Sequence, residues 1–219
     1  MGNILTYHGY THSASDGSIV RGNHLKVITY GCVFHPKSEF NFGGQILNAN
    51  CDIENVEIIG IIKTIAFLQK QKAFKESTMV HVHHVDNTNA LLWAANLSHS
   101  IKSGGTAIDY AEQVTQIHLT TGHSTDAANF ILALRDHDII FRHQKGHTEN
   151  DDVHVGSILN RAADAECEKH KDAVITVTQG IHSTDVNKTT LLNIEKRINK
   201  TVRQNLLLTE DITIEPDGI

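Results

Sequence analysis

The sequence contains few cysteines and no long apolar run, and each shortage excludes a class of protein. Its three cysteines, Cys32, Cys51 and Cys167, are odd in number and widely spaced, which is typical of free thiols in a reducing compartment rather than of a disulfide-stabilised secreted domain. No apolar run approaches the roughly 20 residues that a membrane span requires, and residues 1–4 do not begin a secretory signal. We therefore expect a cytoplasmic protein with no membrane span.

Positive charge is also scarce. The chain carries 19 lysines and arginines against 25 acidic residues, so its net charge is −6 with neutral histidines. This balance argues against a protein that binds nucleic acid by bulk charge alone. Acidic residues gathered around bound metal ions would offset part of the deficit. At 219 residues, with 40% hydrophobic residues, the chain fits one globular domain with room for a C-terminal appendage.

Hydrophobic periodicity and turn residues predict a mixed α/β domain. Strands are predicted over residues 4–15, 25–34, 40–47, 78–85 and 138–144, and helices over 55–74, 88–100, 110–118, 125–134 and 155–169. Asp16-Gly17-Ser18 is predicted to turn the chain after the first strand, and Gly43-Gly44 to form a bulge. A strand that follows a long helix implies a parallel crossover. The order predicts a mixed five-stranded sheet, three antiparallel strands followed by parallel strands, flanked by helices on both faces.

The character of the sequence changes after Lys171, so we expect a domain of residues 1–171 and a C-terminal extension of residues 172–219. Residues 187–208 predict an amphipathic helix with an apolar stripe. Its basic residues are Lys188, Lys196, Arg197, Lys200 and Arg203. One interpretation is that these cations contact a nucleic-acid backbone, because residues 98–127 contain a single lysine and no arginine. The other is that the apolar stripe packs on the domain or pairs with a second copy in a homodimer.

Four acidic residues lie at predicted strand ends or on predicted helix faces. Asp16 follows the first strand, and Asp86 follows the strand over residues 78–85. Glu57 and Asp164 lie on helices able to lean over those strand ends. A cluster of carboxylates would repel itself unless it held divalent metal ions. Two hard cations bound by carboxylates suit hydrolysis of a phosphodiester.

Over about residues 5–171 the order of these pieces resembles type 1 ribonuclease H, which cuts the RNA strand of an RNA/DNA hybrid. The matching pieces, in order, are Asp16-Gly17-Ser18, Tyr30-Gly31-Cys32-Val33, the acid Glu57 opening a long helix, the acid Asp86 ending a strand, Lys145-Gly146-His147, and Asn160-Arg161-Ala162-Ala163-Asp164. The resemblance implies a ribonuclease H-like fold and two-metal-ion hydrolysis with Mg²⁺, or with Mn²⁺ as a substitute.

The resemblance also implies a role for each site residue. Asp16 and Asp86 would be the central metal ligands, while Glu57 helps to hold one ion and Asp164 completes the other. His147 would be a mobile proton carrier, to which its reference pKa of about 6.5 is suited. The family reads the 2′-hydroxyls of the RNA strand with small polar groups near the helix glutamate, a role that Asn55 or Asn50 would take here.

The sequence departs from the family at several positions. The family strand commonly reads Tyr-Thr-Asp-Gly, whereas Tyr10-Thr11-His12-Ser13 places a histidine in that register and Asp16 comes four residues later. We expect Asp16 to be the ligand because Mg²⁺ prefers carboxylates, whereas His12 would favour a softer metal or an inactive site. Arg161 stands where the family often has glutamate, and the loop from His147 to Asp164 is longer.

Two other kinds of function compete with this interpretation. The segment around His81 and His83 resembles a histidine cluster of the metallo-β-lactamase fold, and zinc accepts imidazole ligands. A non-catalytic nucleic-acid-binding module with the same fold is a further alternative, since the chain is acidic and His12 is ambiguous. Within the enzyme class, a nuclease of the same superfold that acts on DNA remains open, although Lys145-Gly146-His147 favours ribonuclease H.

Overall fold

Strand β2 is the central strand of a mixed sheet. The computed structural model describes residues 3–21, 26–46, 51–104, 124–146 and 153–171. Within them the strands are β1 (Leu5–Tyr7), β2 (Tyr10–Arg21), β3 (Lys26–Val33), β4 (Phe42–Gln45), β5 (His81–Val85) and β6 (Ile139–His143). Their order is β4-β3-β2-β5-β6, with β1 paired to β2. The first four pair antiparallel, whereas β5 and β6 run parallel to β2. The predicted ribonuclease H-like sheet, antiparallel strands followed by parallel strands, is confirmed, with six strands among the described residues in place of the five expected.

The first predicted strand differs from what the structure shows. Residues 4–15 form two strands, because the chain turns at His8 and Gly9, whose φ angles are 49° and 80°. The predicted turn at Asp16-Gly17-Ser18 is wrong, since β2 continues to Arg21. The cause is long-range pairing with β3, which supplies a partner for every residue of β2 from Ala14 onward. Asp16 therefore lies inside a strand.

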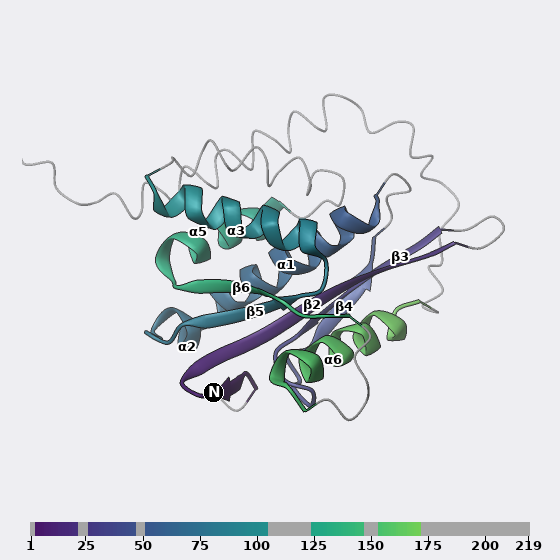
Figure 1. Ribbon diagram of the computed structural model, residues 1–219, viewed down its shortest axis with the longest axis horizontal. Helices are drawn as coiled ribbons and strands as arrows, with labels where there is room; N and C mark the ends of the chain where they lie inside the picture. The colour runs from purple at the N-terminus through teal and green to yellow at the C-terminus, as the bar shows by residue number, and fades with distance from the viewer. Residues whose placement is uncertain (1–2, 22–25, 47–50, 105–123, 147–152, 172–219) are drawn as a thin grey trace, which may run out of the picture. The chain divides into compact units, whose positions relative to one another are not determined.

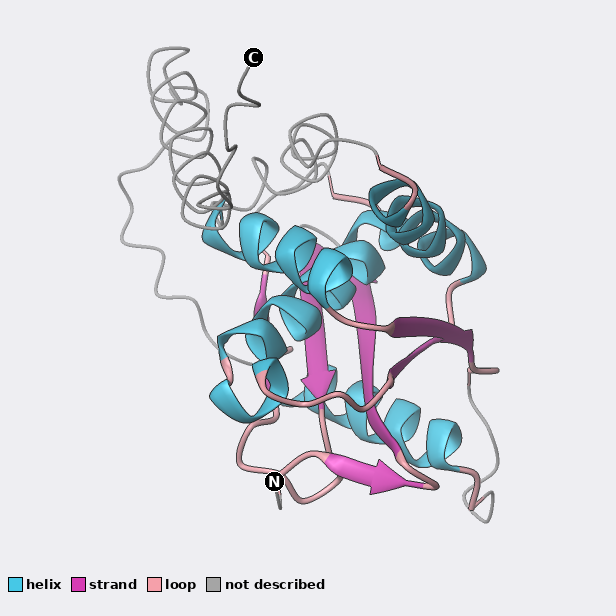
Figure 2. Cartoon of the chain, turned by 90° about the vertical axis from the view of Figure 1, so that its left-hand side faces the viewer, coloured by secondary structure: helices cyan, strands magenta, loops and turns pink. Residues whose placement is uncertain are grey.

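The helices cover both faces of this sheet. They are α1 (Ile53–Lys70), α2 (Lys72–Lys75), α3 (Thr88–Lys102), α5 (Ser124–Asp136) and α6 (Val155–Lys169). Figures 1 and 2 show α1, α3 and α5 on one side of the sheet and α6 on the other. The predicted helix over residues 55–74 is divided into α1 and α2, because Gln71 has an extended backbone. The helix predicted over residues 110–118 lies outside the described residues.

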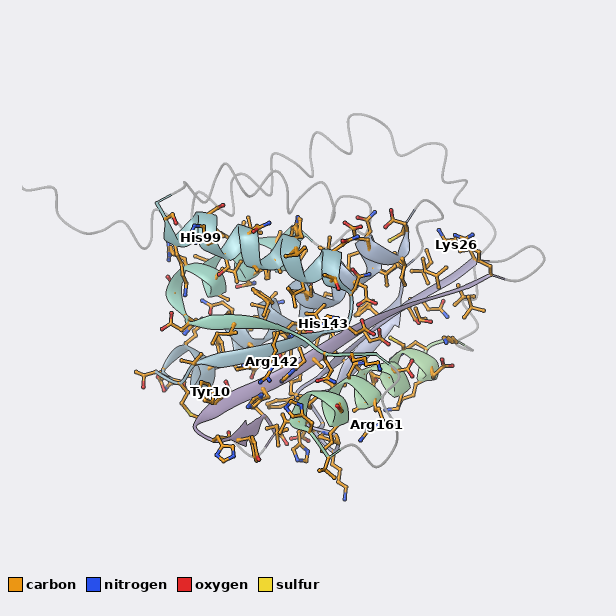
Figure 3. The ribbon with its side chains drawn as sticks, in the orientation of Figure 1. Tyr10, Lys26, His99, Arg142, His143 and Arg161 are labelled. Atoms are coloured by element: carbon orange, nitrogen blue, oxygen red, sulfur yellow. The ribbon has the colours of Figure 1, made fainter. Side chains whose placement is uncertain are left out.

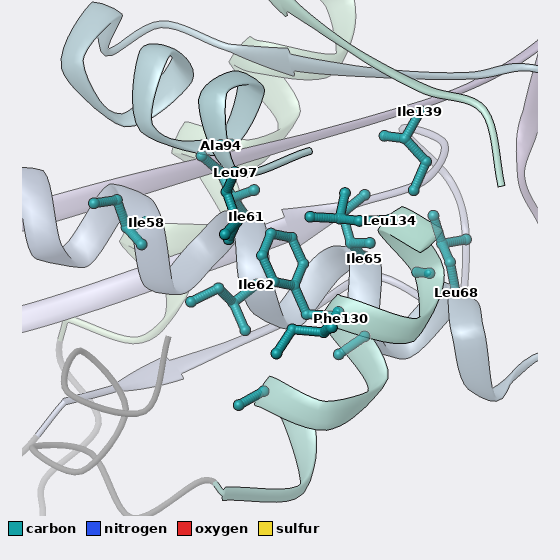
Figure 4. Close-up of a cluster of buried hydrophobic side chains, with 14 of the residues drawn as sticks. Ile58, Ile61, Ile62, Ile65, Leu68, Ala94, Leu97, Phe130, Leu134 and Ile139 are labelled. Atoms are coloured by element: carbon teal, nitrogen blue, oxygen red, sulfur yellow. The ribbon is translucent and has the colours of Figure 1, made fainter. Parts of the chain in front are cut away.

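The larger core lies under α1, α3 and α5. The apolar positions predicted for α1 recur every three or four residues, and the isoleucines among them are fully buried. They meet side chains from α3, α5 and β6, of which Leu97, Phe130, Leu134 and Ile139 are labelled with them in Figure 4. None of the helices in the described part of the chain is both long and apolar enough to cross a membrane.

On the other face, α6 packs directly on β2 and β3. Ala14 and Val33 form a small buried cluster with Leu159 and Ala163 of α6. Gly31 allows this close approach, because a Cβ atom there would lie 2.4 Å from the carbonyl oxygen of Ala163. The predicted bulge at Gly43-Gly44 is absent, since β3 and β4 pair in regular register there. The predicted division at Lys171 and the tail helix concern residues outside the described part.

Candidate active site

A cleft of about 350 Å³ lies at the edge of the sheet where β5 ends. Its lining includes the four acids singled out from the sequence, Asp16, Glu57, Asp86 and Asp164. Asp86 directly follows β5, and Asp16 lies two residues beyond the last residue of β2 that pairs with β5. Glu57 comes from the amino-terminal part of α1, and Asp164 comes from α6. Helices on opposite faces of the sheet therefore place carboxylates at the same edge of the sheet.

Three of these acids form a tight group, which we call the acidic cluster (Asp16, Glu57 and Asp86). Each offers a carboxylate oxygen, and the three oxygens lie within 4.8 Å of one another. Asp16 is 7% exposed and Glu57 is 3% exposed. Asp164 lines the same cleft but lies outside this group of three.

The carboxylates of the acidic cluster repel one another. Burial, followed by the charges of Asp86 and Asp164, raises the pKa of Asp16 to about 7. Burial, together with the charges of Asp16 and Asp86, also raises the pKa of Glu57 well above its ordinary value. Oε2 of Glu57 is buried and has no hydrogen-bond partner among the described residues. A buried carboxylate oxygen without a partner is costly, so these residues fit a divalent cation with oxygen ligands.

His12 lies elsewhere, although it is on the same strand as Asp16. Its Nδ1 atom is 3.1 Å from Nε2 of His84, and the two rings stack with centroids 5.4 Å apart. The structure thus places Asp16, rather than His12, beside Glu57 and Asp86. This arrangement corresponds to the carboxylate site expected for a hard cation.

His81 and His83 share one strand face, as the zinc interpretation requires, but their ring nitrogens are already engaged. Ser13 lies between them, with Oγ 2.7 Å from Nε2 of His81 and 2.8 Å from Nδ1 of His83. The remaining nitrogens face Thr11, at 2.9 Å, and Ser15, at 3.1 Å. We call this chain the histidine–hydroxyl ladder (Thr11, His81, Ser13, His83 and Ser15). It leaves these histidines no nitrogen for zinc, so the structure does not support that alternative.

The other predicted site residues lie partly outside the described residues. Asn55 is half-buried in the first turn of α1, where its backbone N–H donates to Asp52, and it does not line the cleft. His147 is not described, but Gly146 is, and a Cβ atom there would lie 2.9 Å from Oδ2 of Asp86. The chain thus reaches the acidic cluster one residue before His147. The tail residues Lys196, Arg197, Lys200 and Arg203 lie outside the described residues.

The structure adds two asparagines to the cleft that sequence reasoning did not assign to it. Asn160 is 4% exposed, and its Oδ1 atom has no partner in the described part of the chain. Its spacing of four from Asp164 was a visible signal, because residues four apart share a helix face. Asn87 also lines the cleft, and its side chain accepts a hydrogen bond from the N–H of Ala90 at the start of α3.

Comparison with known proteins finds similarity among solved structures. No family model matches the sequence, and no curated protein matches it. Among solved structures, the chain is similar to the solution structure of the PFV RNase H domain, with 14% sequence identity and a TM-score of 0.49. The match covers 73% of this chain and 93% of the other. The fold is ribonuclease H-like because of the order and directions of its strands.

Proposed function

We propose that the protein is a metal-dependent endoribonuclease that hydrolyses the RNA strand of RNA/DNA hybrids. The observation that carries this proposal is the meeting of Asp16, Glu57 and Asp86 in a cleft that Asp164 also lines. Bound Mg²⁺ or Mn²⁺ would lower the pKa of the attacking water and stabilise the leaving oxygen. The acidic cluster would hold one ion, and Asp164 would help to hold a second.

Other residues of the cleft would position the substrate. Arg161 lines the acidic cleft, and its guanidinium group could bind two oxygens of a substrate phosphate at once. Asn160 and Asn87 supply amide groups suited to the sugar-phosphate backbone. Asn55 does not line the cleft, although Ile53 and Glu57 of the same helix do, so its proposed contact with a 2′-hydroxyl requires a substrate that extends beyond the cleft.

A proton must reach the leaving oxygen when the phosphodiester breaks. His147 follows Gly146, which lies against Asp86. An imidazole with a pKa near 6.5 exchanges protons readily at neutral pH, so His147 is the residue that we propose for this transfer. The buried free thiols of Cys32, Cys51 and Cys167 agree with action in a reducing compartment, which we propose to be the cytoplasm.

A panel of labelled duplexes tests this proposal. With Mg²⁺ or Mn²⁺, we expect internal cleavage of the RNA strand of an RNA/DNA hybrid, leaving 5′-phosphate and 3′-hydroxyl ends, and no cleavage of RNA/RNA or DNA/DNA. Cleavage of DNA/DNA in preference to the hybrid would reassign the protein to the DNA nucleases of the same superfold. Binding of the hybrid by folded protein without cleavage in either metal would favour a non-catalytic module.

A further inference from the structure

A second pocket lies at the other end of β2 from the acidic cleft. It encloses about 390 Å³ and is lined by Tyr7, His8, Tyr10, His12, Val82, His84, Ile140, Arg142, His154 and Val155. We call it the tyrosine–histidine pocket. His12 and Asp16 are four residues apart on β2, so the two sites are separated by roughly 13 Å along the strand. Figure 3 labels Tyr10 and Arg142 from this pocket and Arg161 from the cleft.

The charge of this pocket is opposite to that of the cleft. Among the described residues, no aspartate or glutamate lines it, although the protein as a whole has a net charge of −6. Arg142 is exposed on β6 and makes no ion pair within the described residues. Burial above all, then the charges of His12, Arg142 and His154, lowers the pKa of His84 to about 4. His84 is therefore neutral at pH 7, and Arg142 is the permanent cation of the pocket.

The walls of the pocket are aromatic and apolar. Tyr7 is 51% exposed and Tyr10 is 41% exposed, so both rings remain open to a ligand. Both approach the ring of His12 edge-on, with centroids 6.4 Å away. Exposed aromatic rings beside a cation are the combination that binds a planar base together with its phosphate.

The amino-terminal end of α6 adds a further feature that favours an anion. His154 caps this 15-residue helix, and both His154 and Val155 line the pocket. The N–H of Gly156 already donates to Nδ1 of His154, so it is the helix dipole that favours a negative charge at this end. Arg142 and the end of α6 thus contribute positive potential from two different elements of the fold.

We propose that the tyrosine–histidine pocket binds a nucleotide, with its base against Tyr7 and Tyr10 and its phosphate beside Arg142 and the start of α6. The nucleotide is either free or part of a single strand, since both present the same base and phosphate. This site is distinct from the acidic cluster, and its occupation requires neither divalent metal nor hydrolysis.

Calorimetry in metal-free buffer containing EDTA tests the proposal on the full chain. The ligands are AMP, a thymidine pentanucleotide and inorganic phosphate. We expect AMP and the pentanucleotide to bind, and phosphate alone to bind about tenfold more weakly than AMP because it lacks the base. Tighter binding of AMP than of the pentanucleotide would assign the pocket to free nucleotides, and the reverse order to single strands.

Two variants and one control locate the binding. Arg142→Met should weaken binding of AMP by about tenfold, because it removes a charge-assisted contact to phosphate. Arg21→Met is the matched control, since Arg21 is an exposed strand arginine at the far end of β2, and it should leave binding unchanged. Tyr7→Leu should weaken binding of AMP and spare that of phosphate.

Ring signals of His12 and His84 provide a readout on the parent protein, should a variant fail to fold. They should shift in NMR spectra when AMP is added. The proposal is overturned if neither AMP nor the pentanucleotide binds at millimolar concentration, if AMP and phosphate bind equally well, or if AMP binds without moving these signals.

Discussion

Two groups of buried polar residues lie along β2, and they differ in how well their polar atoms are satisfied. In the histidine–hydroxyl ladder, every ring nitrogen of His81 and His83 faces a hydroxyl at 2.7–3.1 Å. In the acidic cluster, three carboxylates face one another, and one buried oxygen of Glu57 has no partner among the described residues. Fully paired buried polar groups stabilise the fold, whereas the unpaired buried oxygen of Glu57, within a group of three carboxylates, fits a site for a cation.

The largest expected effect comes from removing one charge of the acidic cluster. Asp86→Asn should lower hybrid cleavage by at least about 10³-fold, because metal ligation contributes several kcal/mol to the transition state. The same variant should unfold at a higher temperature than the parent in EDTA, since it relieves the repulsion between Asp86 and Asp16. Asp138→Asn, an exposed acid paired with Lys102, is the control and should leave cleavage unchanged. Full activity of Asp86→Asn would exclude this residue from the site.

Removing His147 should have a smaller effect on the same reaction. His147→Ala is expected to slow turnover by about 10²-fold, in the range for loss of a general acid or base, while calorimetric binding of Mn²⁺ stays as in the parent. His99→Ala, at an exposed position on α3, is the matched control. An unchanged rate at saturating substrate would show that His147 takes no part in proton transfer.

The ladder should respond to mutation in stability rather than in activity. Ser13→Ala leaves one buried nitrogen of His81 and one of His83 without a partner, so we expect a loss of about 2–4 kcal/mol in the free energy of unfolding. Ser103→Ala, exposed at the end of α3, should change it by less than about 0.5 kcal/mol. Urea unfolding measures both variants. A Ser13→Ala protein as stable as the parent would mean that the ladder does not stabilise the fold.

The histidine–hydroxyl ladder and the acidic cluster should also change the stability of the fold with pH in opposite directions. Burial lowers the pKa of His81 to about 3, so its contribution to stability is complete above pH 6.5 and is lost as the pH falls toward 3. The pKa of Asp16 is instead raised to about 7 from 3.8, so the metal-free fold loses stability as the pH rises through this interval. In the parent, the two trends oppose each other.

Asp16→Asn should remove the pH dependence that comes from Asp16 and leave the one that comes from His81. In EDTA, its stability should fall more steeply than that of the parent as the pH decreases from about 6.5 to 4.5, by about 1.4 kcal/mol per pH unit. Urea unfolding at several pH values gives both slopes. Parallel curves for variant and parent would contradict the raised pKa of Asp16.

The smallest expected effect concerns the C-terminal extension, which the sequence predicts to carry a basic helix. Replacing Lys196, Arg197, Lys200 and Arg203 by glutamine should raise the KM for the hybrid a few-fold and flatten its dependence on salt, because fewer counterions are released. Replacing the exposed residues Lys37, Lys72, Lys75 and Lys102 of the domain provides a control with the same change in charge. Unchanged salt dependence would assign the predicted helix to packing or to a homodimer instead.

The sequence allowed prediction of those parts of the fold that rest on local patterns. Residues 155–169 form α6 with the predicted bounds, since its apolar residues recur at helical spacing and meet β2 and β3. The extent of β2 was mispredicted, because its pairing with β3 is a long-range interaction that outweighs the local turn preference of Asp16-Gly17-Ser18. The same limit applies to the ladder, because its hydroxyl residues and its histidines lie about 70 residues apart in sequence.

The acidic residues of the candidate site could be predicted from the sequence, whereas most of the residues around them could not. Asp16, Glu57, Asp86 and Asp164 were found by their order along the chain, and all four line one cleft. The contribution of Asn87 depends on the turn that connects β5 to α3, and the tyrosine–histidine pocket depends on β6 lying beside β5. Neither arrangement leaves a periodic signal in the sequence.

The rate of hybrid cleavage as a function of Mn²⁺ concentration tests the central claim most directly. It should be measured on the parent and on Asp86→Asn, with both shown to be folded by circular dichroism. We predict that the parent cleaves the RNA strand at a rate that rises with Mn²⁺ and saturates, and that Asp86→Asn stays near background at every concentration. A folded parent that shows no cleavage at any Mn²⁺ concentration, or a variant that matches the parent, would contradict the account.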